Sequence, residues 1–377
     1  MRSAAVRIVS SMFLLLIYNS TLIAQQFAEL PALPDPHGFA GPFVGVADNQ
    51  LIVAGGANFP EKPLWETDKV WYRSIYVLDK PTGSWRRAAE TLPTETAYGL
   101  SFNLNRHSHP IARDIPQGVL CLGGGNATEH FSSCFVITLQ SGRIKIQSLP
   151  DLPDPIAFTT GVLANGVVYV LGGTHATAST QPAEIFWKLD LTVKRKKVQW
   201  EKLPIWPGPP RMLAVAGCNQ HSLFLFSGTD LVLKSDKTVA RKYLVDAYEY
   251  RFQSGQWRRI ADLPRATVAA PTPAIRRGDN QWIISGDDGQ NALRTNELKD
   301  NHPGFPPGIL QYSPGKNAWS VVGEFPKTPG SNPAEDPHAG IWPPVTTNVT
   351  HWYGKAVIAS GEVRPRVRSR RVFQLDD

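Results

Sequence analysis

One short segment near the C-terminus combines the residue types that acid/base chemistry on an anionic molecule requires. Glu362 follows a small pair of residues, and arginines stand at alternate positions after it, at Arg364, Arg366 and Arg368. A carboxyl group can take up or release a proton during a reaction, and a guanidinium group binds a carboxylate through two parallel hydrogen bonds. If the segment were extended, the three arginines would share one face, although Pro365 interrupts a regular ladder. The simpler interpretation is a loop on which Glu362 pairs with one of these arginines.

Further polar residues stand beside other small pairs or at the start of inner strands, and we treat four of them as candidates for binding a substrate: Asn58, His175, Arg211 and Arg294. His175 follows a glycine pair at the expected mouth of a channel, and a histidine exchanges protons near neutral pH. Arg211 has an equally good structural interpretation, as a side chain that binds the carbonyl oxygens of loops. Asp287 and Asp288 are more typical of a turn than of a site.

A repeated strand pattern must position these residues. Six runs of β-forming residues each end in a small pair, and these pairs finish at Gly56, Gly125, Gly173, Gly228, Gly286 and Gly361. Each run predicts a buried strand followed by a turn that glycine permits. Further along most repeats come another strand, a Gly/Pro turn, a tryptophan and a proline, with the tryptophans at Trp85, Trp200, Trp257 and Trp319.

The repeats predict the architecture. Each has roughly 50 to 75 residues, enough for the four strands of a propeller blade. Six of them indicate an all-β, six-bladed β-propeller in which the tryptophans pack between adjacent blades. A β-sandwich would also contain short strands and turns, but it would not repeat this order of features.

The two ends of the chain predict how the ring closes. The last repeat stops at Asp377 without its tryptophan-and-proline strand, and FAELPALP near the N-terminus resembles that missing strand. We therefore expect residues near Gln26 to Leu33 to complete the sixth blade, which would remove the exposed sheet edges. Residues 25–377 would then form a single domain, with the proline-rich stretches 301–307 and 327–344 as long loops on one face.

Residues 1–24 have the pattern of a cleaved export signal. Arg2 and Arg7 precede an apolar stretch over 12–18, and small and polar residues lead to Ala24. The alternative is a permanent anchor, but the apolar stretch is too short to cross a bilayer as a helix. We expect a periplasmic or secreted protein. Its three cysteines provide no disulfide framework, and Cys121 and Cys134 either pair across a hairpin or remain buried free thiols.

The composition and charge of the chain limit the classes of ligand and partner that we expect. The chain has 377 residues with 39 Lys and Arg against 32 Asp and Glu, a net charge of +7 that slightly favours anionic ligands. There is no block of Lys and Arg that would indicate nucleic acid. Spacings typical of a zinc site, such as CxxC or HExxH, are absent from the sequence. We expect no metal, no cofactor, and no membrane association once the signal is removed.

The small pairs with downstream Tyr and Trp resemble the Kelch repeat. Two segments are similar to parts of the bacterial N-acetylneuraminate epimerases, the sialate mutarotases: LIVAGGANFPEKPLWETDKVWYRSIYVLDKPTGSW with AYGLSF, and ASGEVRPRVRSRRVFQLD. The order of these segments along the chain is rotated relative to the family, as in its cyclically permuted relatives. The resemblance covers nearly the whole chain at the level of blades, but only these two segments match specifically.

This resemblance implies an isomerase of carbohydrate metabolism that interconverts the α and β anomers of free N-acetylneuraminic acid, a sialic acid. In the family motif a Glu directly after the small pair is the proposed acid/base and an Arg six residues later lies at the substrate, which correspond to Glu362 and Arg368. The resemblance adds no cofactor. The chain departs from the family at Thr96, where relatives carry an Arg before the AYG sequence.

Other functions remain open from the sequence. A non-catalytic Kelch propeller that binds a glycan or a protein would need no carboxyl group in its channel. A sialidase would show repeated SxDxGxxW strings, and the nearest match, SPGKNAW at Ser313, lacks both the Asp and the Gly. A Kelch-type copper radical oxidase has little support from three cysteines in strand-like contexts.

Overall fold

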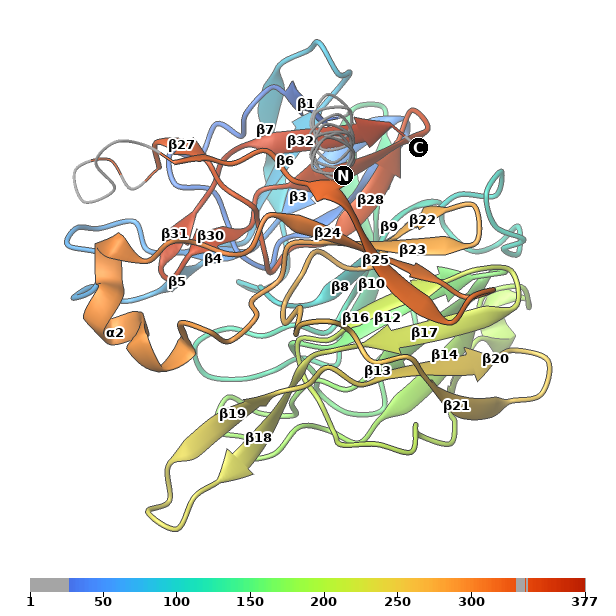
Figure 1. The fold of residues 1–377 in the computed structure, drawn as a ribbon. Helices are drawn as coiled ribbons and strands as arrows, with labels where there is room; N and C mark the ends of the chain where they lie inside the picture. Colours follow the sequence, from blue (N-terminus) through green and yellow to red (C-terminus); the bar gives the residue numbers. More distant parts are fainter. Residues whose placement is uncertain (1–26, 330–335, 337, 377) are drawn as a thin grey trace, which may run out of the picture.

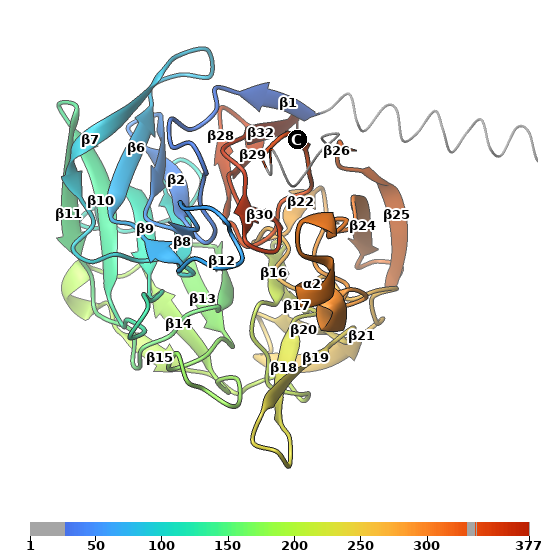
Figure 2. The ribbon, with the colours of Figure 1, turned by 90° about the vertical axis from the view of Figure 1, so that its left-hand side faces the viewer.

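The computed structural model describes residues 27–329, 336 and 338–376, and over these residues the chain forms six four-stranded antiparallel sheets arranged around a central axis (Figures 1 and 2). The six-bladed β-propeller expected from the repeats is confirmed. The proposed export signal over 1–24 lies outside the described residues.

The blades follow one another along the chain, and the strands of each blade are named in order from the central axis outwards. Blade 1 contains β2 (Phe43–Ala47), β3 (Gln50–Ala54), β6 (Ser74–Leu78) and β7 (Trp85–Thr91); blade 2 contains β8 (Leu100–Leu104), β9 (Gly118–Leu122), β10 (Cys134–Gln140) and β11 (Arg143–Ser148). Blade 3 contains β12 (Thr160–Ala164), β13 (Val167–Leu171), β14 (Phe186–Asp190) and β15 (Trp200–Lys202); blade 4 contains β16 (Val215–Cys218), β17 (Ser222–Phe226), β20 (Ala247–Arg251) and β21 (Gln256–Ile260). Blade 5 contains β22 (Ile275–Arg277), β23 (Asn280–Ile284), β24 (Gly308–Ser313) and β25 (Ala318–Glu324); blade 6 contains β28 (Val349–Trp352), β29 (Lys355–Ala359), β32 (Val372–Asp376) and β1 (Phe27–Leu30).

The N-terminal strand closes the ring. Strand β1 pairs antiparallel with β32, with Phe27 opposite Leu375 and Leu30 opposite Val372. The outer strand of blade 6 therefore comes from the opposite end of the chain from the other three. This confirms the expected closure and covers an edge of β32 that would otherwise be open to pairing with another chain.

The repeated tryptophans fasten neighbouring blades to one another. Each stands in the outer strand of its blade, and its indole N–H donates to a backbone carbonyl at the end of the preceding blade. These bonds join Trp85 to Pro31, Trp200 to Pro150, Trp257 to Pro204 and Trp319 to Ala261, at 2.7 to 2.9 Å. A tryptophan at this position supplies both apolar area and a satisfied polar group, which explains the recurrence of Trp in the sequence.

A closed ring of six backbone hydrogen bonds surrounds the central axis. The residue just before each inner strand region has a positive φ, between +54° and +65°, and its N–H donates to the carbonyl of the equivalent residue in the preceding blade. The donors and acceptors, at 2.6 to 3.0 Å, are Gly41 to Thr346, Tyr98 to Gly41, Phe158 to Tyr98, Leu213 to Phe158, Ala269 to Leu213 and Thr346 to Ala269. Each of these residues is thus both a donor and an acceptor, which fixes the six blades at one radius.

The connections that follow the second strand of several blades carry extra structure. These are the hairpins β4–β5 (Ala57–Asn58, Val70–Trp71), β18–β19 (Thr229–Leu233, Val239–Tyr243) and β30–β31 (Glu362–Arg364, Val367–Arg368), and the helical segment η2 (Ala292–Arg294), α2 (Thr295–Leu298) and η3 (Lys299–Asn301). Figure 1 shows them on one side of the propeller, together with β27 (Gly340–Ile341), which pairs with β26 (Thr328–Pro329). A single turn, η1 (Arg195–Lys197), lies between β14 and β15. One face therefore carries most of the variable loops.

Cys121 and Cys134 are buried free thiols. They lie on the paired strands β9 and β10, but Cys121 is opposite Phe135 and Cys134 is opposite Leu122. Because consecutive residues of a strand point to opposite faces, the two thiols enter different apolar clusters on the two sides of blade 2. Of the two alternatives left open by the sequence, the structure has the free thiols.

Changing Gly41 tests the importance of the axial ring. A Cβ on Gly41 would lie 2.5 Å from the backbone N of Tyr98, the next residue of the ring. We expect Gly41→Ala to lower the free energy of unfolding by about 1–3 kcal/mol more than a control with positive φ alone. The control is Gly142→Ala, at φ +76° with nothing within 4 Å of the added Cβ. Urea denaturation of both variants makes the comparison, and equal losses would contradict it.

Candidate active site

Six equivalent residues surround the mouth of the propeller above the axial ring. Five of them directly follow a small pair and the sixth is the last glycine of a run of three, and each forms an antiparallel bridge with the residue that precedes a ring position. These six residues are Ala57, Gly125, Thr174, Thr229, Asp287 and Glu362. Ionisable side chains occur at two of the six positions, in the adjacent blades 5 and 6, so any acid/base chemistry by this set belongs to that part of the mouth.

Glu362 has one carboxylate oxygen fixed and the other available. Its Oε1 accepts hydrogen bonds from the backbone N–H of Arg366 at 3.1 Å and from Nη1 of Arg368 at 3.2 Å. No described residue donates to Oε2, and the side chain is 22% exposed. The carboxylate is therefore oriented by its neighbours while one oxygen can still reach a molecule in the mouth.

Arg368 is a buried cation whose hydrogen bonds are incomplete. Its side chain is 3% exposed, it lies directly opposite Glu362 in the β30–β31 hairpin, and its guanidinium group stands 4.9 Å from the ring centre of Phe59. Its Nε has no hydrogen-bond partner among the described residues. A buried donor without an acceptor costs free energy, and an anionic ligand would supply the missing acceptors.

The other two arginines of this segment support the site. Nη1 of Arg364 donates to the carbonyl of Asp300 at 2.8 Å, and its guanidinium group lies 4.9 Å from the ring of Trp342. Burial lowers the pKa of Arg364 below that of an ordinary arginine. Nη1 of Arg366 donates to the carbonyls of Leu64 and Thr67 at 2.7 and 2.9 Å. Both side chains tie the hairpin to neighbouring loops.

The three arginines do not form one extended row. The segment folds back on itself, so that Arg364 is paired with Val367, and Arg366 stands in the turn with φ +66°. Pro365 lies within this turn, and a proline cannot continue the donor pattern of a strand. The condition for a shared face of Arg364, Arg366 and Arg368, an extended segment, is therefore not met, and the interruption expected at Pro365 is present.

Aromatic rings and further cations border the same hairpin. Phe59 lies 4.5 Å from the guanidinium group of Arg366 and 5.8 Å from the ammonium group of Lys69. Lys69 also lies 5.2 Å from the ring of Tyr98, a member of the axial ring. This concentration of positive charge on apolar rings favours an anionic ligand that also has carbon–hydrogen surface.

Asn58 lies next to this cluster, but its amide is already engaged. The side chain is fully buried, its Nδ2 donates to the carbonyl of Gly38 at 2.8 Å, and its Oδ1 accepts from the hydroxyl of Tyr72 at 2.8 Å. These bonds hold the β4–β5 connection in place. The geometry favours a positioning role for Asn58 over direct contact with a ligand.

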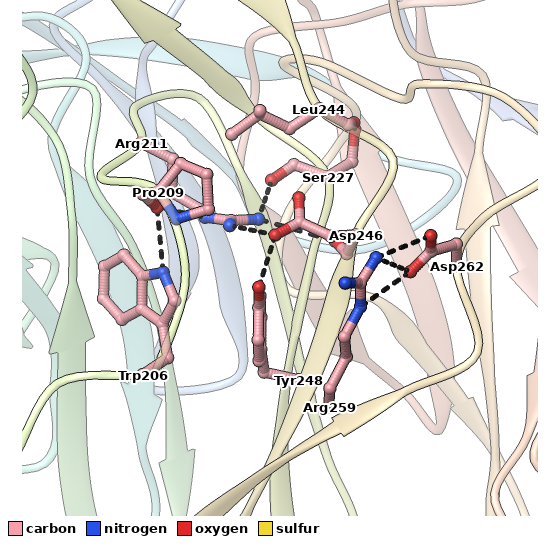
Figure 3. A network of polar contacts seen from close by, with 9 residues as sticks. All are labelled: Trp206, Pro209, Arg211, Ser227, Leu244, Asp246, Tyr248, Arg259 and Asp262. Carbon is pink, nitrogen blue, oxygen red and sulfur yellow. Dashed lines mark hydrogen bonds and ion pairs between the residues drawn. The ribbon is translucent and has the colours of Figure 1, made fainter.

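Arg211 is part of a buried polar network that holds the loops of blade 4 (Figure 3). Its side chain is fully buried, with Nη1 2.9 Å from the carbonyl of Ser227 and Nη2 2.7 Å from Oδ2 of Asp246. The same Oδ2 accepts from the hydroxyl of Tyr248 at 2.6 Å. Of the two interpretations of Arg211 that the sequence allowed, these contacts match the structural one, in which the side chain binds the carbonyl oxygens of loops.

The remaining candidates, Arg294 and His175, and the turn residue Asp287 have partners other than Glu362 and Arg368. Arg294 is more than half exposed and forms an ion pair with Glu297 at 2.8 Å on the short helical segment. His175 is exposed, and its Nδ1 lies 2.9 Å from the carbonyl of Pro155. Neither contacts Glu362 or Arg368 among the interactions of the described residues. Asp287 accepts from the N–H of Gly289 at 2.9 Å, as in a turn, and from the hydroxyl of Tyr243 at 2.6 Å.

Several residues near Glu362 and Arg368 were not found from the sequence. His338 donates from Nδ1 to the carbonyl of Arg368 at 3.0 Å, and its Nε2 lies 3.2 Å from Nδ1 of His37. His302 is buried in the loop after η3. None of these histidines has a repeat or a spacing that marks it, because each is brought to the site by a loop of a different length.

Two further kinds of feature are absent from the part of the chain that the structure describes. No helix there is long and apolar enough to cross a membrane. No group of three or more His, Cys, Asp and Glu side chains in that part is arranged to hold a metal ion.

Comparisons with known proteins give matches to the N-acetylneuraminate epimerases. A family model described as N-acetylneuraminate epimerase matches residues 149–296, which cover blades 3 and 4 and part of blade 5. The chain is 26% identical to the N-acetylneuraminate epimerase of Yersinia enterocolitica over 259 residues, which are 63% of this chain and 60% of that relative. The chain is thus similar to N-acetylneuraminate epimerases over part of its length.

Other epimerases match at similar levels. The protein from Shigella sonnei is 24% identical over 64% of this chain and 63% of its own length, and the one from Haemophilus influenzae is 24% identical over 60% and 59%. The chain thus spans about three fifths of the length of the epimerases that it matches. The family model ends before Glu362 and Arg368, so the role of these two residues depends on the hairpin geometry and on the sequence motif.

Removing the charge of Asp246 tests the structural role of Arg211. Asp246→Asn leaves a buried guanidinium group without its counterion, which costs about 3–5 kcal/mol in the free energy of unfolding. A matched control is Asp262→Asn, because Asp262 pairs with Arg259 on the surface and an exposed pair contributes only about 0–1 kcal/mol. Urea denaturation at pH 7 measures both, and similar losses in the two variants would contradict the assignment.

Acidification provides a second measurement on Asp246. Burial alone would raise the pKa of this carboxyl group, but the hydrogen bond and charge of Arg211, with the hydroxyl of Tyr248, outweigh burial and lower it. A lowered pKa contributes stability that is present above the unfolded value and is lost as the pH falls through the folded one. The difference between wild type and Asp246→Asn is therefore expected to shrink below about pH 4. A constant difference down to pH 2 would be inconsistent with this ion pair.

Proposed function

We propose that this protein interconverts the α and β anomers of free N-acetylneuraminic acid by acid/base catalysis at the mouth of the propeller. The match of residues 149–296 to the N-acetylneuraminate epimerase family model, and the 26% identity to one such epimerase, support the class of reaction. The observation that carries the proposal for this chain is Glu362, a partly exposed carboxylate at a mouth position, with Oε1 bound by Arg368 and no described residue donating to Oε2. A protein that only binds a glycan has no need for a carboxylate oriented in this way.

The reaction requires one proton to move between two oxygens of the sugar. The carboxylate of Glu362 takes the proton of the anomeric hydroxyl, the bond between the anomeric carbon and the ring oxygen breaks, and its electron pair goes to the ring oxygen. The ring oxygen then receives the proton from Glu362, leaving an open-chain keto acid. Closure on the other face of the keto group reverses these steps and gives the other anomer. Nothing is oxidised or reduced, and Glu362 ends as it began.

Arg368 is suited to hold the carboxylate of the substrate. Nη1 binds Glu362, whereas Nε has no partner among the described residues. A carboxylate that approaches the free side of the guanidinium group would gain charge-assisted hydrogen bonds in a buried setting. This contact would also place the anomeric carbon, which bears that carboxylate, beside Oε2 of Glu362.

Substitution of Glu362 and Arg368 tests these roles. We start from crystalline N-acetylneuraminic acid, which dissolves as a single anomer, and follow its approach to the equilibrium mixture of anomers by NMR. The uncatalysed rate is subtracted from the rate measured with protein. Glu362→Gln is expected to lower kcat by about 10²–10⁴-fold because the amide cannot take the proton. Arg368→Lys is expected mainly to raise KM, because an ammonium group cannot form the bidentate contact.

The surface variant Arg259→Gln serves as the control, since Arg259 pairs only with Asp262 outside the mouth. Wild-type rates in folded Glu362→Gln would remove the acid/base assignment. Binding of the sugar without acceleration by the wild-type protein would instead favour a glycan-binding propeller.

We also propose that the chain is exported and that its blades are rotated in order relative to those of the matched epimerases. The rotation is supported by matches that stop at about three fifths of each relative, as expected when collinear alignment must break at the point of rotation. Export is supported by the charged, apolar and small-residue order over 1–24. In an exporting bacterial host, N-terminal sequencing of the mature protein is expected to begin at Gln25, and recovery of an intact N-terminus would contradict cleavage.

A further inference from the structure

The loop that follows η3 is fixed against the hairpin that carries Glu362. The carbonyl of Asp300 accepts from Nη1 of Arg364 at 2.8 Å. Gly304 approaches the same strand so closely that an added Cβ would lie 3.2 Å from the carbonyl oxygen of Val363 and 2.8 Å from the ring of Trp342. His302 lies between these two fixed points. Its side chain is therefore held beside β30, the strand that begins at Glu362.

The hydrogen bonding of His302 defines which nitrogen carries its proton. The N–H of Gly304 donates to Nδ1 at 3.1 Å, so Nδ1 acts as an acceptor. A neutral ring must then carry its hydrogen on Nε2. His302 is 6% exposed, and Nε2 has no hydrogen-bond partner among the residues that the structure describes. Nε2 is not among the fully buried polar atoms that lack a partner, so a ligand or water can still reach this donor of an otherwise buried ring.

Burial, more than the surrounding charges, favours the neutral form of the His302 ring. Burial lowers its pKa most strongly, with Arg364 and Lys327 adding to the effect, whereas the carboxylates of Asp287 and Glu362 oppose it. The outcome is a pKa below the ordinary value for histidine. Protonation of Nδ1 would also break the bond from Gly304, because two donors would then face one another. The influence of both carboxylates places His302 near the two ionisable positions of the mouth.

We propose that His302 contacts the substrate as a neutral hydrogen-bond donor, with Nε2–H bound to the oxygen on the anomeric carbon that becomes the keto oxygen when the ring opens. The inference rests on the proposed function, because it assigns a partner within that reaction. The electrostatic influence of Glu362 on His302 indicates that the ring lies near that carboxylate, and the oxygen that gives its proton to Glu362 is a ligand atom in that region. In the proposed arrangement Arg368 binds the carboxylates of Glu362 and of the substrate. It is therefore not the donor to the anomeric oxygen.

This role adds no proton to the reaction. A neutral imidazole stabilises the charge that develops on the oxygen once Glu362 has taken its proton, and it keeps its own hydrogen throughout. A protonated ring would instead form an ion pair with Glu362 or Asp287 and would compete with the substrate. The lowered pKa therefore suits a donor that acts on a carbonyl without carrying charge.

The experiment compares two variants with different donor capacity. His302→Phe keeps the ring shape and removes the donor, and we expect kcat to fall by about 10²-fold or more with a change in KM of less than about threefold. His302→Gln retains an N–H at the far end of the side chain and is expected to recover part of the loss. His107→Gln, an exposed histidine in a separate loop, is the control.

A role confined to holding the loop predicts other results. In that case both variants would lower the thermal midpoint and kcat together, without recovery in His302→Gln, and the proposal would be overturned. Unchanged kcat in a folded His302→Phe would also overturn it. If the wild-type protein fails to accelerate the reaction at all, the proposed function fails and this proposal with it.

A measurement without substrate separates the two claims. The ¹⁵N NMR signals of the His302 ring report its tautomer directly, and we expect a neutral ring protonated on Nε2 between pH 6 and 8. A ring protonated on Nδ1, or a charged ring in this range, would overturn the assignment of His302 even if mutarotation is observed.

Discussion

The closed ring of six backbone hydrogen bonds is the constraint on which the rest of the molecule depends. Each of its residues donates to one blade and accepts from the next, so no blade can move outward without breaking two bonds. The residues after the small pairs bridge directly to the neighbours of this ring. The positions of Glu362 and Asp287 at the mouth therefore follow from the closure of the backbone and not from any contact between their own side chains.

The buried arginines around this ring differ in how many of their hydrogen bonds the protein itself satisfies. Arg211 has its counterion and several carbonyl acceptors, and Arg366 has two carbonyl acceptors, so both are satisfied by the protein itself. Arg368 has a single anchor in Glu362 and a buried Nε without an acceptor among the described residues. Because burying an incompletely bonded cation is unfavourable, a ligand that accepts a hydrogen bond from Nε of Arg368 would complete the surroundings of this side chain.

The fold could be predicted from the sequence because its signals are local and repeated. The small pairs recur in all six blades, the tryptophans of the outer strands join four blades to the preceding one, and the match between the two chain ends reports the closure of the ring. The glutamate and arginine of the β30–β31 hairpin were also identifiable, since they belong to a short motif. Their ion pair across the hairpin was the simpler interpretation, and the structure contains it.

The surrounding residues could not be predicted in the same way. The alternation of Arg364, Arg366 and Arg368 indicated a row, but the turn at Pro365 folds it into a hairpin whose arginines have separate partners. His302 and His338 arrive on irregular loops, so their approach depends on tertiary packing that has no period in the sequence. Arg294 shows the converse, since a residue next to a predicted site lies on an exposed helical segment with its own partner.

The central claim is that the mouth of this propeller opens and recloses the ring of an acidic sugar. Exchange spectroscopy on N-acetylneuraminic acid labelled with ¹³C at the anomeric carbon tests it at equilibrium, with no change in composition to follow. Substoichiometric wild-type protein is predicted to produce cross-peaks between the α and β signals on a timescale at which the free sugar shows none. Binding of the sugar without such cross-peaks would contradict the account.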